Sequence, residues 1–360
     1  MSLVQNFISK LKTNKFALED EQSKLSFLNY CTETSTANFF LGRSSDHFKF
    51  ALSNQDFRES ILTAQKKSMK HQSSLKSFLK LANTNNIDIC LLKGAYMSNF
   101  MYSKFTMRTM RDIDVLVEED SFLKIVNTML LNGYSFLNTK INKLDKFNFS
   151  YSHQAPILVD KFGTAFEIHH RLKRHSEFKN SDHLAKNLMQ SKKEKFFCDL
   201  AVSIPSENYA FIHCCYHAIG KSKLNIGPIF LNDLLQFKNI NDHEVLEDAK
   251  RANCIKEVNL GISLLRYLKG HDVANEKHVK DALEIIIYCH NMPELFPRKS
   301  FNFLSSVKDS YAHNSFALSI NNFLIFKLKQ IFMFCKSYSL KFNLHKKRRR
   351  FFKGFSNKEF

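Results

Sequence analysis

The chain has 360 residues, enough for one large domain or two smaller ones. Hydrophobic residues make up 44%, so a large core can form, and only 9 glycines and 5 prolines favour helices over a loop-rich or all-β fold. A net charge of +19 favours nucleic acid, nucleotides or an anionic membrane surface as partners. Eight cysteines without CxxC spacing are typical of reduced thiols and argue against a disulfide framework or a zinc site.

The first part of the chain, residues 1–86, is predicted to be an N-terminal helical region. Its longest helical pattern runs from about Phe57 to Ala82 and ends at a polar stop, 83–86. We expect this region to pack against a sheet, and its sequence indicates no chemistry.

Strand and helix patterns alternate over the next part, residues 87–175. The apolar run 89–92 predicts a buried strand, and Lys93 and Gly94 after it predict the start of a helix. The first N–H groups of a helix can bind a phosphate, and a glycine lets a ligand approach the backbone closely. This turn is therefore a candidate phosphate site.

Two aspartates, Asp112 and Asp114, precede the next apolar run, 115–117, which predicts a second strand. Side chains two positions apart in a strand point the same way, so the carboxylates would share one face. Adjacent carboxylates repel unless a cation lies between them, and Mg²⁺ binds one or two carboxylates together with substrate phosphates. Arg108 and Arg111, just before them, could neutralise more phosphate charge. The alternative is a solvated acidic edge without a ligand.

A third strand is predicted from Ala165 to Leu172. Its period-2 pattern places Glu167, His169 and Arg171 on one face. If this strand lies next to the aspartates, Glu167 completes a three-carboxylate site and could orient or deprotonate an attacking hydroxyl. The alternative is an ordinary strand with a polar exposed face.

Helical patterns return over residues 176–315, which we predict to form a helical domain. His213 and His217 lie one turn apart, but no HExxH motif joins them, so partly buried histidines with ordinary partners are expected. Asp233 lies between apolar residues of the next helix, which indicates a cap, a salt-bridge partner or a group that supports the site.

The last segment, residues 316–360, is a basic, aromatic, amphipathic tail that contains the cationic run 346–350. Such a tail could bind an anionic membrane or a nucleic acid, or could be a packed helix followed by a solvated end. The N-terminus lacks a secretory signal and no stretch is apolar enough to span a membrane. We therefore expect a cytoplasmic protein, or one held at the inner membrane surface through this tail.

In combination, the motifs resemble those of the uncharacterised nucleotidyltransferase family of the DNA polymerase β superfamily, over about residues 90 to 240. The matching segments are Leu-Leu-Lys-Gly (91–94), Tyr102, Met-Arg-Thr-Met-Arg-Asp-Ile-Asp-Val-Leu-Val (107–117), Gly133-Tyr134 and Glu-Ile-His-His-Arg-Leu (167–172), with His217 and Asp233 further on.

The resemblance implies an α+β fold, in which a mixed β-sheet with helices is flanked by the N-terminal helices and the helical domain. It also implies an enzyme that moves a nucleoside monophosphate from an NTP such as ATP to a hydroxyl acceptor and releases pyrophosphate. Asp112, Asp114 and Glu167 would be the catalytic residues and would bind two Mg²⁺ or Mn²⁺ ions about 3.5–4 Å apart.

The remaining residues of the motifs would bind the triphosphate or support the carboxylates. The resemblance implies that Lys93, Arg108 and the Gly94 backbone neutralise the triphosphate. The backbone of Ala95 and the Arg111 side chain would add to this site. His169 and Arg171 would orient Glu167 or contact the substrate.

Two positions depart from the family pattern. Ala95 follows Gly94 where a serine or a second glycine is usual, so only backbone donors remain there. His170 replaces the usual tryptophan. The acceptor could be a small molecule, a sugar, a protein or RNA. Two alternatives to an enzyme are an inactive binding protein that uses its tail, and a helical scaffold in which Glu167 lies far from Asp112.

Overall fold

A seven-stranded mixed sheet in the order β3-β4-β5-β2-β1-β7-β6 forms the middle of the protein. The computed structural model describes residues 8–9, 11–12, 21–43, 54–137, 152–173, 182–288 and 351. The strands are β1 Cys90–Leu91, β2 Ile113–Leu116, β3 Ser135–Phe136, β4 Leu158–Val159, β5 Ala165–His169, β6 Lys193–Phe197 and β7 Leu200–Ile204.

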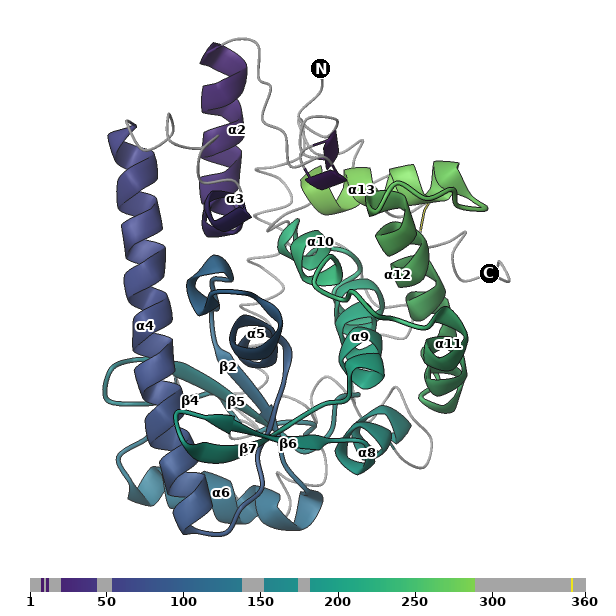
Figure 1. Cartoon of the computed structure of the whole chain (residues 1–360). Helices are drawn as coiled ribbons and strands as arrows, with labels where there is room; N and C mark the ends of the chain where they lie inside the picture. Colours follow the sequence, from purple (N-terminus) through teal and green to yellow (C-terminus); the bar gives the residue numbers. More distant parts are fainter. Residues whose placement is uncertain are drawn as a thin grey trace, which may run out of the picture.

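Helices surround this sheet, which confirms the predicted α+β fold class (Figure 1). They are α2 Glu21–Glu33, α3 Ala37–Arg43, α4 Gln55–Thr84, α5 Lys93–Tyr96, α6 Glu119–Leu131, α8 His183–Gln190, α9 Glu207–Cys215, α10 Ile229–Leu234, α11 Asp242–Arg251, α12 Ile255–Leu268 and α13 Glu276–Tyr288. Short π-helical segments, Met97–Met101 and Tyr216–Lys221, continue α5 and α9, and a 3₁₀ turn covers Phe105–Met107.

The two central strands, β2 and β5, run parallel to each other, and β2 also pairs antiparallel with β1. All four residues of β2 are buried, which is expected of a strand covered on both faces. The register of β2 and β5 places Asp114 directly opposite Glu167. The sheet therefore joins two segments that are more than 50 positions apart in the sequence.

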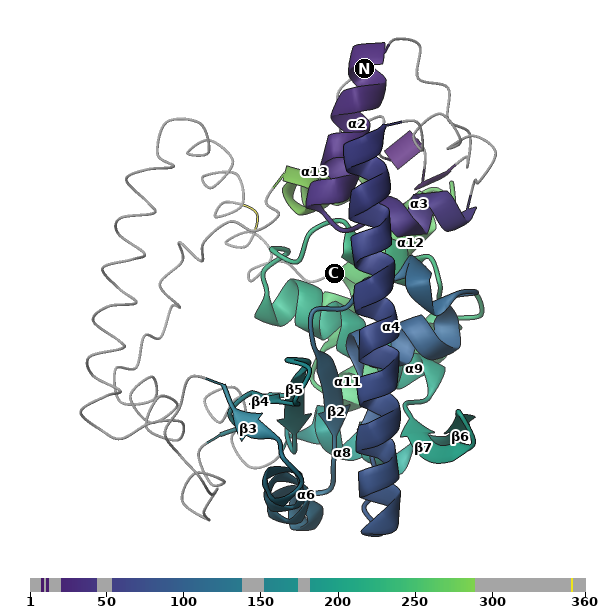
Figure 2. The same ribbon diagram turned by 90° about the vertical axis from the view of Figure 1, so that its left-hand side faces the viewer.

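The long helix α4 covers one face of the sheet. It begins where the side chain of Asn54 accepts a hydrogen bond from the amide of Phe57 at 3.0 Å. Phe78 of α4 packs against Phe166 of β5, with ring centroids 5.2 Å apart. Figure 2 shows α4 passing the length of the molecule, from α2 to the sheet. The predicted packing of the N-terminal region on a sheet is confirmed.

The opposite side of the molecule holds the helices α9 to α13 (Figure 1). Between α8 and α9, however, the chain forms the hairpin β6–β7, and β7 pairs parallel with β1. The prediction of helices alone over residues 176–315 is wrong here. Strand β6 lies at the edge of the sheet with Lys193, Glu194 and Lys195 exposed, so it lacks the apolar alternation that marks a strand.

Most of the basic tail lies outside the described residues. Within the tail, Phe351 is described, and its ring stacks on His278 with centroids 4.1 Å apart. Among the helices of the described ranges, none combines the length and the apolar character needed to cross a membrane.

Candidate functional site

A cavity of about 850 Å³ lies between the sheet and the helical side of the molecule. Residues from the turn after β1, from the start of β2, from β5 and from α9, α10 and the π-helical segment between them line it. Asp112, Asp114 and Glu167 all face this cavity, and we refer to these three residues as the carboxylate centre.

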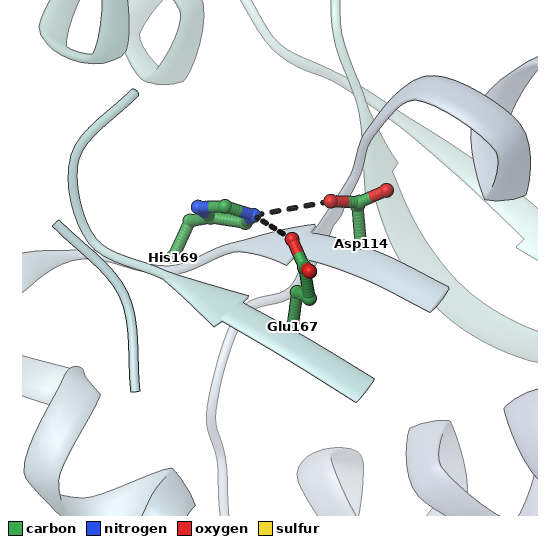
Figure 3. Close-up of side chains that lie close together, drawn as sticks. All are labelled: Asp114, Glu167 and His169. Carbon is green, nitrogen blue, oxygen red and sulfur yellow. Dashed lines mark hydrogen bonds and ion pairs between the residues drawn. The ribbon is translucent and has the colours of Figure 1, made fainter. Parts of the chain in front are cut away.

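Two neighbouring strands bring the carboxylate centre together. Figure 3 shows Asp114 and Glu167 on adjacent strands with their side chains on the same side, beside His169. His169 Nε2 lies 3.1 Å from Oδ1 of Asp114 and 3.4 Å from Oε2 of Glu167. One ligand atom each from Asp114, Glu167 and His169 lies within 4.8 Å of the other two. The scaffold alternative requires Glu167 to lie far from Asp112, whereas both residues line one cavity and the charge of Glu167 acts on Asp112.

Asp114 is the most enclosed member of the centre, with 3% of its surface exposed. The ammonium of Lys93 lies 2.5 Å from Oδ1 of Asp114. Burial alone would raise the pKa of Asp114, but the charge of Lys93 and the hydrogen bond from His169 hold it well below the ordinary value. Burial would lower the pKa of Lys93, yet Asp114 and Glu167 raise it, so both partners are charged.

Asp112 has the opposite electrostatic character. Its burial, followed by the negative charges of Asp114 and Glu167, raises the pKa of Asp112 to about 6. Lys93 and Arg108 offset only part of this effect. The negative charges of the three carboxylates therefore act on one another in a partly buried site, a condition under which a bound metal ion is favoured.

The turn between β1 and α5 holds Lys93 next to the centre. The amide of Leu92 donates to the carbonyl oxygen of Asp114 at 3.0 Å, so the backbones of the two segments are tied together. Lys93 has a φ of +40°, a conformation that is unfavourable for residues other than glycine. A Cβ at Gly94 would lie 2.7 Å from Nη1 of Arg108, so a larger residue there would require the guanidinium to shift.

Arg108 is buried and forms a double ion pair across the cavity. Its Nε lies 2.7 Å from Oδ1 of Asp233, and its Nη2 lies 2.8 Å from Oδ2. The hydroxyl of Tyr102 donates to the same carboxylate at 2.8 Å. Asp233 is thus a salt-bridge partner, one of the roles predicted for it. Two of the three guanidinium nitrogens of Arg108, Nε and Nη2, donate to Asp233. The third nitrogen, Nη1, lies beside Gly94.

The other three residues predicted to bind the triphosphate differ in their position relative to the cavity. Arg111 is exposed and lines the cavity, and Ala95 is buried one residue beyond Gly94. Arg171 does not line the cavity; its Nε donates to Glu119 at 2.8 Å. The period-2 argument placed Arg171 beside Glu167, but β5 ends at His169 and the chain turns before Arg171.

His170, at the position where the family usually has tryptophan, is part of the core. Its ring lies 4.3 Å from that of Phe122 between centroids, and its Nε2 lies 2.7 Å from the carbonyl oxygen of Ser152. Burial lowers the pKa of His170 to about 3, so it is neutral. A ring at this position therefore packs on α6 and does not stack on a ligand in the cavity.

The helical side contributes residues whose exposure to the cavity the sequence did not indicate. His213 and His217 both line the cavity, with ring centroids 6.5 Å apart. Burial, and next the charge of Lys93, lower the pKa of both far enough to keep them neutral. Lys67 of α4 and Lys221 also line the cavity, although the N-terminal region showed no chemistry in its sequence.

The side chains of the centre suit a divalent cation. Carboxylate oxygens are the ligands that Mg²⁺ and Mn²⁺ favour, and an imidazole nitrogen is compatible with Mn²⁺. Asp114 and Glu167 present their oxygens to the same point, and Asp112 adds a carboxylate from the residue just before β2. The residues therefore fit the metal that the family resemblance implies.

The fold and the site define a class: an α+β protein with a carboxylate centre on two adjacent parallel strands, beside a strand–helix turn at the mouth of a cavity. The chain belongs to the Uncharacterised nucleotidyltransferase family, whose sequence model matches residues 23–270. The predicted family is confirmed.

Among solved structures, the chain is similar to an antigenic nucleotidyltransferase-like protein from Paracoccidioides brasiliensis. The two share 12% sequence identity with a TM-score of 0.29, over 63% of this chain and 96% of that chain. A search of the curated proteins found no match.

Proposed function

We propose that the protein transfers a nucleoside monophosphate from an NTP to a hydroxyl acceptor and releases pyrophosphate. The observation that supports this most strongly is the carboxylate centre, built from Asp112, Asp114 and Glu167 at the edge of a large cavity. Membership of the nucleotidyltransferase family supports the same reaction class. The domain boundaries, with a catalytic core over 87–175, belong to this proposal, although strands β6 and β7 extend the sheet to Ile204.

In the proposed reaction, the acceptor hydroxyl attacks the α-phosphorus of the NTP. A bond forms between the acceptor oxygen and phosphorus, the bond to the oxygen that bridges to the β-phosphorus breaks, and pyrophosphate leaves. Glu167 accepts the proton of the hydroxyl, and His169 holds the carboxylate of Glu167 in place through Nε2 at 3.4 Å. Bound at Asp112, Asp114 and Glu167, Mg²⁺ or Mn²⁺ would supply positive charge to the phosphate oxygens.

The triphosphate is proposed to lie at the turn between β1 and α5. Gly94 lines the cavity at the start of α5, and its amide is proposed to donate to a phosphate oxygen. Nη1 of Arg108 lies beside Gly94, while its other nitrogens are fixed by Asp233. Arg111, at the exposed edge of the cavity, adds a further positive charge.

The test is to incubate the full chain with each α-labelled NTP, with Mg²⁺ or Mn²⁺ and with a cell extract, and to identify what becomes labelled. Label should move to an acceptor, with release of pyrophosphate. The double variant Asp112→Asn, Asp114→Asn should remove transfer, while Asp272→Asn, a change on an exposed loop, should not. Unchanged turnover in the double variant would refute the assignment.

The binding-only alternative, in which the tail 316–360 grips nucleic acid or an anionic membrane, stays a prediction. The tail lies outside the described residues except for Phe351.

A further inference from the structure

The position of one side chain has consequences for how the carboxylate centre takes up its metal. Lys93 contacts Asp114 through an ion pair of 2.5 Å, and its charge also acts on Asp112 and Glu167. Its ammonium thus contacts Asp114 directly and acts electrostatically on the other two carboxylates. A cation bound by these oxygens would have to share Asp114 with Lys93 or displace it.

We propose that Lys93 competes with the metal ion for Asp114. Lys93 stays paired with Asp114 until a bound triphosphate attracts its ammonium away. The protein would then bind a divalent cation weakly by itself and tightly together with a triphosphate. This inference rests on the proposed function, because it takes the triphosphate to lie at the turn between β1 and α5.

The competition follows from which oxygen is occupied. Both Lys93 Nζ and His169 Nε2 approach the same oxygen, Oδ1 of Asp114, at 2.5 Å and 3.1 Å. This is also the strand position opposite Glu167, so the shared oxygen faces the middle of the centre. A metal ion requires deprotonated, unblocked ligand atoms, and an ammonium that close to Oδ1 repels a divalent ion approaching it.

Until a ligand arrives, the anions that act on Lys93 are the carboxylates of the centre itself. The other nearby cation, Arg108, pairs through two nitrogens with Asp233, which is thereby already compensated. A lysine side chain has a flexible four-carbon stem, so its ammonium can change partner without a change in the backbone. The proposed phosphate site begins at the next residue, Gly94, well within reach of that stem.

The backbone at Lys93 indicates that its position is under a specific constraint. A φ of +40° at a residue with a side chain is strained relative to an ordinary conformation. The hydrogen bond from Leu92 to the carbonyl of Asp114 ties this strained residue to its ion-pair partner. Glycine would relieve the strain, so Lys93→Gly removes the ammonium in a backbone that suits the substitution.

The experiment measures Mn²⁺ binding to the full chain by electron paramagnetic resonance, without nucleotide and without turnover. Lys93→Met and Lys93→Gly should each bind Mn²⁺ about tenfold more tightly than the wild type, a factor typical of coupling between two ligands. Lys250→Met is the matched control, because Lys250 is exposed on α11 and lies outside the residues that line the cavity. Its Mn²⁺ affinity should stay within about twofold of the wild type.

Inorganic triphosphate provides the second arm. It should raise the Mn²⁺ affinity of the wild type, after correction for Mn²⁺ bound by triphosphate in solution, and should raise that of the Lys93 variants much less. Equal or weaker Mn²⁺ binding by both Lys93 variants would overturn the proposal, as would an absence of Mn²⁺ binding by every protein tested. Because none of these measurements needs a reaction, tighter binding by the variants without nucleotide transfer would contradict only the proposed function.

Discussion

Asp112 is predicted to destabilise the metal-free protein. The folded state holds its proton more tightly than the unfolded chain does, since the pKa rises from 3.8 to about 6. The unfolding free energy should therefore fall as the pH rises from about 4 to about 6, and the penalty should be fully present above that range. About two pKa units at about 1.4 kcal/mol each correspond to about 3 kcal/mol.

Asp112→Asn removes this ionisation and keeps the size of the side chain. In the presence of EDTA and at about pH 7.5, urea denaturation should show that the variant is more stable than the wild type, by up to about 3 kcal/mol. Near pH 4 the two proteins should have nearly equal stability. Asp272→Asn, on an exposed loop, should change stability by less than about 0.5 kcal/mol at either pH. A less stable Asp112→Asn variant at neutral pH would refute this electrostatic reasoning.

The remaining predictions concern the metal and the buried ion pair. Mn²⁺ affinity, measured by calorimetry, should fall by about tenfold for each pH unit below about 6, because a proton on Asp112 competes with the ion; a flat profile from pH 5 to 7 would contradict this. Arg108→Met should cost about 3–5 kcal/mol in urea denaturation because it leaves Asp233 buried without its cation, and adding Asp233→Asn should recover much of that loss. Gly94→Ala should cost about 1–3 kcal/mol, because its Cβ would crowd the guanidinium of Arg108; a neutral effect would show that the arginine can move.

Local patterns were enough to predict the strands that carry the carboxylate centre. The alternation that places Glu167 and His169 on one face, and the aspartates two positions apart before β2, are set by the geometry of a strand. The pairing of β2 with β5 could not be derived from periodicity alone, since the alternation within one strand does not indicate which strand lies next to it. The family resemblance supplied that expectation.

The contacts between distant segments are the part that the sequence did not reveal. Arg108 and Asp233 lie 125 positions apart, and although the sequence marked both residues, it did not indicate that they pair with each other. The same holds for the ion pair between Lys93 and Asp114, whose side chains meet only because β1 and β2 are adjacent. Arg171 shows the reverse error, since a pattern was extended past the end of its strand.

The most direct test of the account is to locate Mn²⁺ by anomalous scattering in crystals grown with Mn²⁺ and a non-hydrolysable NTP analogue. The account predicts Mn²⁺ bound by oxygens of Asp112, Asp114 and Glu167, next to phosphates at the start of α5, with the ammonium of Lys93 on a phosphate. Mn²⁺ bound elsewhere, with Lys93 still paired to Asp114 and no phosphate at that turn, would contradict it.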